Sequence, residues 1–408
     1  MTVSRTLILG LTRHLTTNRL FLMSTNRLFP VTGIGGITSN GECRLIYDYP
    51  EPQRSELLDY LFLPNFGLSA QILKVEIGSD AQSTVGTEPA FQHVRGEISY
   101  DRGIQFWFLV EAKKRNPNIT IAALLWSAPS WTANSTAAGA APAGTNGFFS
   151  ALTVNYIMDW MYGATKVWNI SNVDYLGIWN EPPVLQVPEY WLIELKTALL
   201  AHGYARTSIV APDASSTGSQ VKAILAAMLK NTSVGDAVDV IGTHGPWQSK
   251  PAAFAQLQQA HKRAWVSESW HQMGTWQGAI GMVDRVLAAQ SVGYSGWTAW
   301  GLLFAAYPVT LCQDKGLLYA TQPWAASYSV QTSVWSTAHF TQFSKPTGWS
   351  WLASGSGTGT FGKFGRYATL SDGQDWSLIV NHLKSCDHGG WNMDGTVNFP
   401  GKQPRWCT

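Results

Sequence analysis

The sequence predicts an α/β fold in which a (β/α)8 barrel is followed by a partial β-sandwich. Between about residues 31 and 335, eight short apolar runs alternate with stretches in which apolar residues recur at helical spacing. This alternation is typical of parallel strands joined by helices, and eight such units match a closed barrel. An open doubly wound sheet is the alternative. No Gly-x-Gly-x-x-Gly motif opens a helix after a strand, so nothing favours a dinucleotide site.

The predicted strands are rich in Val, Ile, Leu, Trp and Tyr. In chain order they are Val31–Gly36, Ile72–Ile77, Ile119–Trp126, Tyr175–Trp179, Ser208–Ala211, Val238–Thr243, Trp265–Ser267 and Trp297–Trp300. In the clearest helices, apolar residues lie three or four positions apart and therefore share one face. Examples are Glu56–Leu63, Gln105–Lys114, Thr153–Val167, Glu189–Ala201, Gln220–Lys230 and Ala252–His261.

The two ends of the chain depart from this pattern. Residues 1–30 are basic and contain no acidic residue, and we assign them no function. Strand-like runs between Gly/Ser turns follow the barrel at Trp349–Leu352, Phe361–Leu370 and Trp376–Asn381. We therefore expect a barrel over residues 31–335 and a truncated β-sandwich over residues 336–408, unless the N-terminal residues supply further strands. The Ala/Gly-rich stretch Thr132–Gly147 is expected to form a mobile loop over the barrel mouth.

Composition excludes several classes of function. Charged residues make up 13% of the chain and there are 20 Trp, so ample apolar surface is available for a core. Trp is also a flat apolar platform for a sugar ring. The net charge is +2 without a dense basic run, which argues against nucleic-acid binding. No run of 18 apolar residues occurs, so we expect no transmembrane segment.

The cysteines and glycosylation sequons bear on the cellular compartment. No pair of cysteines has metal-ligand spacing, and their disulfide pairing stays open for Cys43, Cys312, Cys386 and Cys407. Asn-x-Ser/Thr sequons, which are compatible with a secretory route, begin at Asn118, Asn134, Asn169 and Asn231. The N-terminus shows no clear signal peptide.

Glu181 stands where the fourth predicted strand ends. The apolar run before it stops at Asn180-Glu181, and Pro182 cannot prolong a strand because it lacks an N–H. The carboxyl ends of the strands are where catalytic residues gather in an α/β barrel. Glu181 is therefore a candidate general acid/base, and a hydrogen-bonded structural Glu is the alternative.

Glu268 ends the seventh predicted strand, 87 residues after Glu181 (268 minus 181). Strands four and seven lie across a barrel from each other, so both side chains can converge over its mouth. Two converging carboxylates about 5–5.5 Å apart are the machinery of a retaining glycosidase. We expect the charge of Glu268 to keep Glu181 protonated as the acid/base, with Glu268 ionised as the nucleophile. A structural ion pair is the alternative for Glu268.

Beyond this pair, the chain resembles the galactocerebrosidases, glycoside hydrolase family 59 of clan A. The resemblance runs from about Gly33 to Cys386. It is carried by Tyr49–Pro52, Asp59–Phe62, Leu73–Gly78, Gly86–Pro89, Glu111–Thr120, Gly177–Glu181, Val238–His244 and Ser336–Phe343. In that family a β-sandwich and a lectin-like domain follow the barrel. Against that pattern, we expect this sequence to contain only a shortened sandwich and no lectin-like domain.

The resemblance implies roles for individual residues. Glu181 matches the acid/base and Glu268 the nucleophile. The residues that match sugar-binding positions are Thr84, Trp126, Asn180 and Trp300. Without the resemblance, Thr84 would be read as a turn residue and the two tryptophans as core.

Three departures from the family pattern leave the sugar specificity open. Cys312 stands where the family has a sugar-facing Tyr. His388 stands where the family has an Arg that reaches the site, and imidazole cannot reproduce the guanidinium fork. Gly245 replaces the Tyr that follows His244. None of these changes touches the two glutamates.

We therefore expect a retaining β-galactosidase that acts on galactosylceramide-like glycosphingolipids. The alternatives are a β-glucosidase or other retaining β-glycosidase, and a non-catalytic carbohydrate- or lipid-binding homologue. The resemblance also implies a lysosomal or secreted protein that is assisted by a saposin-like activator. No metal or organic cofactor is implied, because two carboxylates and water suffice.

Overall fold

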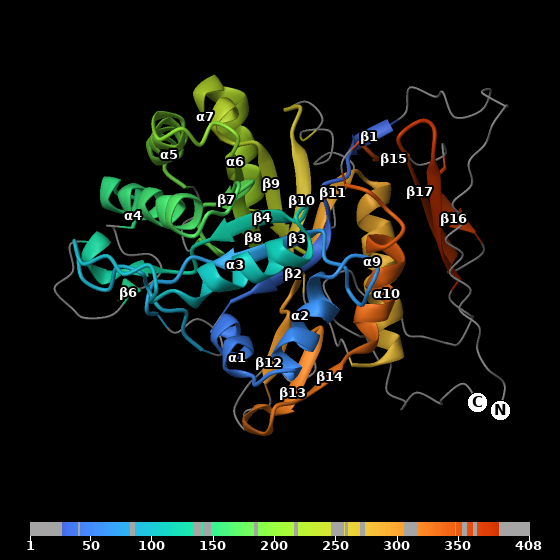
Figure 1. The fold of residues 1–408 in the computed structure, drawn as a ribbon. Coiled ribbons are helices and arrows are strands. Elements are labelled where there is room, and N and C mark those ends of the chain that lie inside the picture. Colours follow the sequence, from blue (N-terminus) through green and yellow to red (C-terminus); the bar gives the residue numbers. More distant parts are fainter. Residues whose placement is uncertain are drawn as a thin grey trace, which may run out of the picture.

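The computed structural model describes residues 27–39, 41–81, 86–133, 140–141, 148–182, 187–215, 219–245, 257, 260–269, 274–305, 316–346, 348–352, 357–361 and 365–382. Eight parallel strands close into a barrel, which confirms the predicted fold class (Figure 1). They are β2 (Gly33–Thr38), β3 (Ile72–Glu76), β4 (Thr120–Leu124), β7 (Tyr175–Gly177), β8 (Ser208–Ser215), β9 (Val240–His244), β10 (Arg263–Ser269) and β11 (Tyr294–Trp300). Each corresponds to one predicted strand. The pairings β11–β2 and β9–β10 leave the sheet without a free edge.

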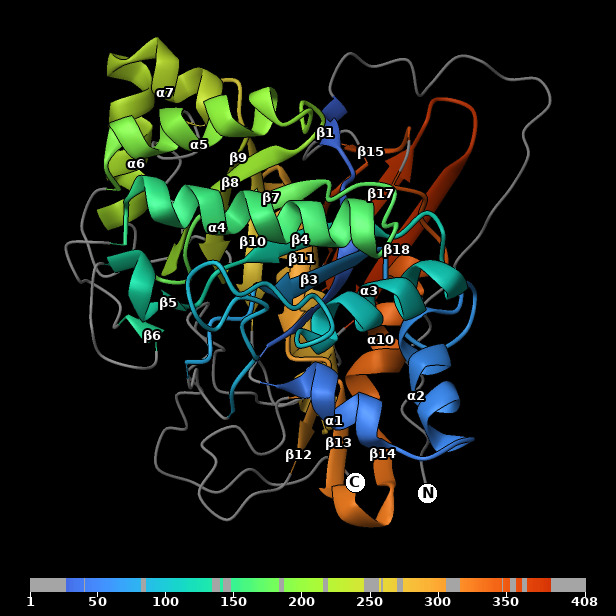
Figure 2. The same cartoon turned by 60° about the vertical axis from the view of Figure 1, so that its left-hand side comes forward.

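Helices alternate with these strands and cover the outside of the barrel (Figure 2). They are α1 (Glu42–Asp48), α2 (Gln53–Phe62), α3 (Ile104–Arg115), α4 (Ala151–Tyr162), α5 (Glu189–Ala201), α6 (Ser219–Lys230), α7 (Thr232–Ala237), α9 (Trp276–Ser291) and α10 (Thr332–Thr341). Ser150, Asn231 and Thr275 cap α4, α7 and α9, each accepting a hydrogen bond from a backbone N–H of the first turn. A π-helical turn, η2 (Gly163–Val167), extends α4 to the predicted end of that helix.

The helical layer of the barrel extends beyond its predicted end. Helix α10 packs against α9 and β2 and so belongs to the helical layer of the barrel, and the predicted barrel end at residue 335 falls inside it. The predicted helix Ala252–His261 lies mostly outside the described residues.

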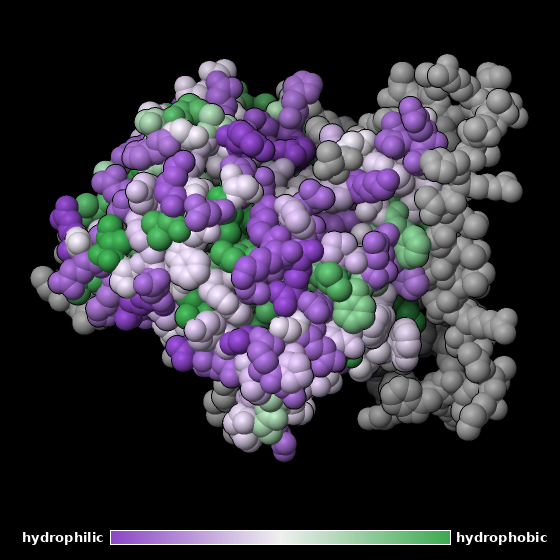
Figure 3. Space-filling view, viewed as in Figure 1, coloured by the Kyte–Doolittle hydropathy of each residue, from purple (hydrophilic) through white to green (hydrophobic). Residues whose placement is uncertain are grey.

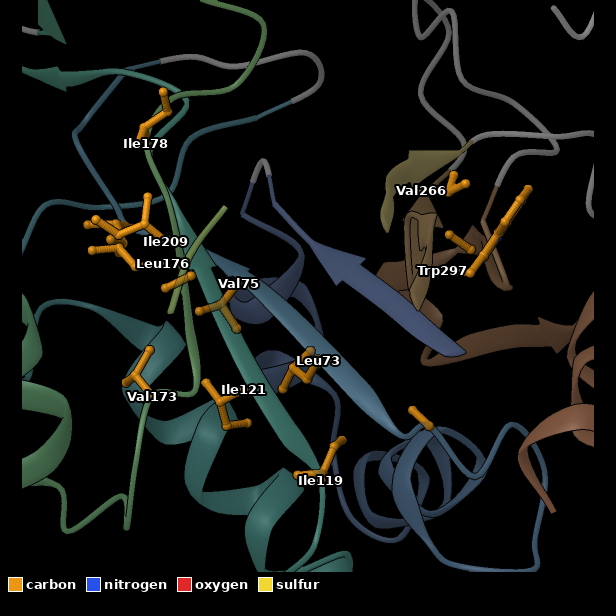
Figure 4. Close-up of a cluster of buried hydrophobic side chains, with 14 of the residues drawn as sticks. Leu73, Val75, Ile119, Ile121, Val173, Leu176, Ile178, Ile209, Val266 and Trp297 are labelled. Carbon is orange, nitrogen blue, oxygen red and sulfur yellow. The ribbon is translucent and has the colours of Figure 1, made fainter. Parts of the chain in front are cut away.

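Side chains of the barrel strands alternate between an inner and an outer layer. On β3, Ile72 belongs to a cluster inside the barrel, while Leu73 and Val75 belong to the layer between strands and helices. Figure 4 shows Leu73, Val75 and Ile121 in this outer layer. By the same alternation, Lys74 and Glu76 point inward above Ile72. A buried lysine inside the barrel requires an anionic or hydrogen-bonding partner.

A second sheet lies beside α9 and α10 (Figure 1). Its strands are β1 (Arg27–Pro30), β15 (Ser350–Leu352), β16 (Gly359–Phe361), β17 (Gly365–Ser371) and β18 (Trp376–His382). Buried residues of β15, β17 and β18 share one hydrophobic cluster with the barrel, and Arg366 pairs with Asp284 of α9 at 2.7 Å. The sheet and barrel therefore have a common core. β1 pairs antiparallel with β15, so residues near the N-terminus do supply a strand.

The predicted single strand Phe361–Leu370 is wrong. Phe361 is the register partner of Gly365 in an antiparallel pairing, so the chain reverses direction between β16 and β17. Gly365 is the first residue of β17, and a glycine at this point is consistent with the break because glycine weakens the interior of a strand.

Smaller elements complete the described chain. Three strands that follow β11 form a separate sheet: β12 (Leu303–Ala305), β13 (Leu318–Gln322) and β14 (Ser327–Val330). The sheet includes the 3-10 turn η3 (Pro323–Ala325), and near the barrel mouth lie β5 (Ala128–Pro129), η1 (Ser130–Ala133) and β6 (Ala140–Ala141). Most of the predicted loop Thr132–Gly147 lies outside the described residues.

The surface matches a barrel wrapped by amphipathic helices. The face seen in Figure 3 is mainly hydrophilic, with apolar groups in small patches such as the one between α2 and α10. Across the described ranges, we find no helix whose length and apolar character would let it cross a bilayer.

Candidate active site

Glu181 follows β7 at the carboxyl end of the barrel. Its backbone adopts a positive φ of 47°, an uncommon conformation for a residue other than glycine. Its N–H donates to the carbonyl of Asp213 at 2.9 Å, while the N–H of Asn180 donates to the carbonyl of Leu125 at 2.8 Å. The Glu181 side chain is 57% exposed and therefore open to the barrel mouth. These backbone bonds tie the predicted acid/base to the two neighbouring strands.

Glu268 reaches the same mouth because β10 is irregular. Val266 belongs to the outer layer, and strict alternation would turn Glu268 outward as well. The register between β9 and β10 shifts between Val266 and Glu268, as in a β-bulge. Bulges re-aim side chains in this way and are frequent beside active sites. The N–H of Gly245 donates to the Glu268 carbonyl at 2.6 Å, and Gly245 has a φ of 76° that suits glycine.

His244, the last residue of β9, connects the two glutamates. Its Nδ1 lies 3.1 Å from Glu181 Oε1 and 3.7 Å from Glu268 Oε1. These two carboxylate oxygens are therefore separated by no more than 3.1 Å plus 3.7 Å, about 6.8 Å. The structure thus brings together the two carboxylates that were predicted from distant strands.

Asp213 lies beneath His244 inside the barrel. Its carboxylate accepts hydrogen bonds from His244 Nε2 at 2.9 Å, from Ser267 Oγ at 2.8 Å and from Lys74 Nζ at 2.9 and 3.0 Å. Asp213 is placed as Glu268 is, by a register shift, here between Pro212 and Ala214 of β8. Its own φ is 56°. Lys74 also donates to the Ser267 carbonyl at 2.9 Å, so the buried ammonium is fully engaged.

The charges of this cluster shift one another's ionisation. Burial alone lowers the pKa of His244, but the charge of Glu268 and hydrogen bonds to Asp213 and Glu181 outweigh burial and raise the pKa to about 10. Burial raises the pKa of Asp213, and the charges and hydrogen bonds of Lys74 and His244 reverse this effect and lower it to about 2. This cluster therefore combines two cations, Lys74 and His244, with the carboxylates of Glu181, Asp213 and Glu268.

The expected order of the two glutamate pKa values is wrong for this structure. The hydrogen bond from His244 lowers the pKa of Glu181, against the opposing effect of burial. The pKa of Glu268 is raised, because burial outweighs the attraction of His244 and Lys74. The prediction considered the repulsion between the glutamates and hydrogen bonds to Glu268, and it placed no cation between them.

Asn180 and Trp126 form a second set of contacts on Glu268. With its amide oxygen turned toward Trp126, Asn180 accepts from Trp126 Nε1 at 3.0 Å and donates from Nδ2 to Glu268 Oε2 at 3.2 Å. The indole thus fixes the direction of the amide, and the amide holds the second carboxylate oxygen of Glu268. Binding of a sugar by these two residues stays a prediction.

Among the remaining predicted site residues, Trp300 is described and buried. Trp300 is 7% exposed, donates from Nε1 to Ser39 Oγ at 3.1 Å and packs edge-on against Phe304, so its described contacts are with protein. Thr84, Cys312 and His388 lie outside the described residues. In the described ranges, no group of three or more His, Cys, Asp or Glu side chains is arranged to hold a metal ion.

Sequence reasoning missed Lys74, Asp213 and His244 as members of the site. Each had a usable signal, because each is a charged or titratable residue within or directly after an apolar strand. Lys74 interrupts an otherwise apolar run, Asp213 follows Ala211-Pro212, and His244 ends the sixth strand.

Comparisons with known proteins agree with this architecture. The sequence profile of "Glycosyl hydrolase family 59" matches residues 31–342. Human galactocerebrosidase is 39% identical over 364 residues, which cover 87% of this chain and 49% of the human protein. Zebrafish (Danio rerio) galactocerebrosidase is 36% identical over 361 residues, covering 87% of this chain and 51% of that protein. The chain thus spans about half the length of the curated relatives it matches.

A solved structure reproduces the fold. SrfJ from Salmonella typhimurium superposes with a TM-score of 0.68 at 16% identity, covering 90% of this chain and 92% of that one. At this identity the likeness concerns the fold alone.

Proposed function

Because this chain belongs to glycosyl hydrolase family 59, we propose that it is a retaining β-galactosidase that hydrolyses galactosylceramide-like glycosphingolipids. The observation that carries the proposal is the position of His244 Nδ1, 3.1 Å from Glu181 Oε1 and 3.7 Å from Glu268 Oε1. This position limits the separation of the two carboxylate oxygens and is compatible with the roughly 5–5.5 Å of retaining enzymes.

In the first step, a Glu268 oxygen attacks the anomeric carbon and the bond to the aglycone oxygen breaks. Glu181, carrying a proton, delivers it to that departing oxygen. In the second step, Glu181 removes a proton from water, the water oxygen bonds to the anomeric carbon, and the bond to Glu268 breaks. Glu181 ends protonated and Glu268 ionised, ready for another cycle. We expect Asn180 to contact the sugar 2-hydroxyl, and the contact of its amide with Glu268 supports this role.

The ionisation of the site favours work at acid pH. Glu181 must be protonated for the first step, yet the hydrogen bond from His244 lowers its pKa. An acidic medium increases the protonated fraction of Glu181, and the productive form is most populated at an acid pH at which part of Glu268 is still ionised. This requirement supports a lysosomal or acidic secreted location. The sequons at Asn118 and Asn169, both on exposed residues, are also compatible with that location.

In this proposal, the choice of galactose as the sugar and of a glycosphingolipid as the substrate rests on the family and on the names of the relatives. A β-glucosidase or another retaining β-glycosidase is the alternative, because the loops of the pocket read the 4-hydroxyl and the glutamate pair does not. We also propose, from the resemblance, that a saposin-like activator presents the lipid. Addition of such an activator to galactosylceramide vesicles should raise the rate of hydrolysis but leave the rate with a water-soluble galactoside unchanged.

The first experiment is hydrolysis of fluorogenic β-galactoside and β-glucoside at about pH 4.5 by wild type and Glu268→Gln. We expect cleavage of the galactoside, reduced at least about a thousandfold in the variant. Cleavage of the glucoside alone would support the same mechanism with glucose in place of galactose as the preferred sugar. A folded wild type that cleaves neither would favour the non-catalytic homologue.

Azide then assigns the two roles independently. With an activated β-glycoside, Glu268→Gly and azide should form the α-glycosyl azide, because azide enters from the face that the nucleophile has vacated. With Glu181→Ala, azide should form the β-glycosyl azide, because it attacks the glycosyl-enzyme from the opposite face. The reverse pairing of variants and products would exchange the roles of the two glutamates.

A further inference from the structure

We propose that His244, anchored by Asp213, is a positioning residue that holds a positive charge between Glu181 and Glu268 and thereby sets the pH range in which the pair works. The inference rests on the proposed glycosidase function, and it deepens that function by naming what controls the ionisation of the two glutamates.

Hydrogen-bond geometry supports a doubly protonated His244. Its Nε2 lies 2.9 Å from Asp213 Oδ1, and its Nδ1 lies 3.1 Å from Glu181 Oε1. Ionised carboxylates only accept hydrogen bonds, whereas neutral imidazole has one donor nitrogen and one acceptor nitrogen. Both contacts are satisfied with ionised carboxylates only when both ring nitrogens carry a proton. The site therefore favours the imidazolium cation.

Asp213 is suited to anchor that cation. It is 1% exposed, and its carboxylate is oriented by Lys74 from β3 and by Ser267 from β10. Its backbone carbonyl also accepts from the Glu181 N–H at 2.9 Å. Asp213 thus holds Glu181 by two routes, directly through the backbone and indirectly through the imidazole.

The charges that face His244 come from three strands of the barrel. They are Glu181 after β7, Asp213 on β8 and Glu268 on β10, with Lys74 on β3 behind Asp213. Without the imidazolium, three carboxylates would face a single cation. Ionisation of both glutamates would then become less favourable, because an opposite charge within about 4–6 Å lowers a carboxyl pKa by roughly one to three units.

The inference predicts a specific change in the pH profile. In His244→Gln, which retains a hydrogen-bond donor without the charge, both limbs of the kcat/KM profile should move to higher pH by about one unit or more. Because the pKa of Glu181 is lowered and that of Glu268 is raised, the two limbs report the titration of the glutamate pair as a whole, and both carboxyls lose the attraction of the imidazolium in the variant. A merely structural histidine would lower the whole profile without moving its limbs.

A matched control is available on the barrel exterior. His202 is exposed at the end of α5, and its Nδ1 contacts the Ala198 carbonyl at 2.8 Å. We expect His202→Gln to retain the wild-type profile, measured with whichever β-glycoside the wild type cleaves. Unmoved limbs in folded His244→Gln would overturn the inference.

A measurement on intact wild type separates this inference from the proposed activity and needs no variant that folds. In an NMR titration of 15N-histidine-labelled protein, the His244 ring should remain doubly protonated from pH 5 to about pH 8, since its pKa is raised to about 10. His202 provides the internal reference for an exposed histidine. A neutral His244 ring at pH 7 would refute the inference even in an active enzyme. A doubly protonated His244 ring in a protein that cleaves no glycoside would refute the proposed activity but would support the inference that His244 holds a positive charge.

Discussion

The backbone N–H of Glu181 donates to the backbone carbonyl of Asp213 at 2.9 Å, and both residues have a positive φ, 47° and 56°. The candidate acid/base and the buried anion of the neighbouring strand are therefore held together in a pair of unusual backbone conformations. Such conformations persist only where the surroundings over-determine them, and they concentrate at functional sites. Here the surroundings are Lys74, Ser267 and His244, all hydrogen-bonded to Asp213.

Removal of Asp213 should destabilise the protein strongly. In Asp213→Ala, the Lys74 ammonium would stay buried without its anion, and we expect a loss of about 3–5 kcal/mol in the free energy of unfolding. Denaturant titration at pH 6 measures it. Arg44→Ala is the matched control, because Arg44 pairs with Asp48 at 2.7 Å on the exposed face of α1. That change should cost less than about 1 kcal/mol. Equal losses would contradict the role given to Asp213.

The same residue should make stability depend on pH at the acid end. The folded protein holds the pKa of Asp213 near 2, below the ordinary 3.8, so its contribution is present above about pH 4 and is lost as pH falls toward 2. The contribution amounts to about 2 kcal/mol. Wild type should therefore lose more stability than Asp213→Asn between pH 5 and pH 2.5, as measured by denaturant titration at each pH. Parallel curves would count against this assignment.

Glu42 should produce the opposite dependence. Its side chain is buried and accepts hydrogen bonds from the N–H groups of Leu302 and Leu303, while burial raises its pKa well above the ordinary value. A raised folded pKa gives stability that is complete below about pH 4.5 and declines as pH rises. Glu42→Gln retains an acceptor and cannot ionise. We expect it to raise Tm at pH 7 by about 2 °C or more and to leave Tm at pH 4 unchanged, by calorimetry. A lower Tm at pH 7 would disprove the assignment.

Trp126 should act on catalysis through Asn180. Trp126→Phe retains the aromatic face but removes the Nε1–H that fixes the Asn180 amide. Loss of one such hydrogen bond, about 1–1.5 kcal/mol, should reduce kcat/KM about tenfold in a variant that remains folded. Trp107→Phe, on the outer helix α3, serves as the control and should leave kcat/KM unchanged. A purely stacking role for Trp126 would instead leave kcat/KM of the Phe variant near wild type.

Most of the fold follows from the sequence because hydrophobic periodicity reports which face of each element is buried. The strands ending at Glu181 and Glu268 were recognisable as apolar runs that stop at a carboxylate. The side-chain directions were not recognisable. Alternation counted from Val266 turns Glu268 away from the mouth, and alternation counted from Ala211 does the same for Asp213. Only the register shifts in β10 and β8 turn these residues inward. No short pattern in the sequence predicts such a bulge.

The pKa shifts of the site could not be predicted from the sequence, because they depend on contacts between residues that are far apart in the chain. His244 lies 24 residues before Glu268 and 63 residues after Glu181 (268 minus 244, and 244 minus 181). The contacts that link His244 to both glutamates depend on the closure of the barrel. Similarly, residues 27–30 carry little strand signal, and they become a strand only because β15 offers its edge.

The pairing of β1 with β15 has a consequence for the synthesis of the chain. About 320 residues separate Pro30 from its register partner Ser350. At about 5–20 residues per second, translation of that interval takes on the order of tens of seconds. Throughout that time, the β1 segment has left the ribosome tunnel while its partner strand does not yet exist. The barrel strands can associate during elongation, but the second sheet can assemble only when β17 and β18 emerge, so β1 is synthesised before the barrel and joins its sheet after it.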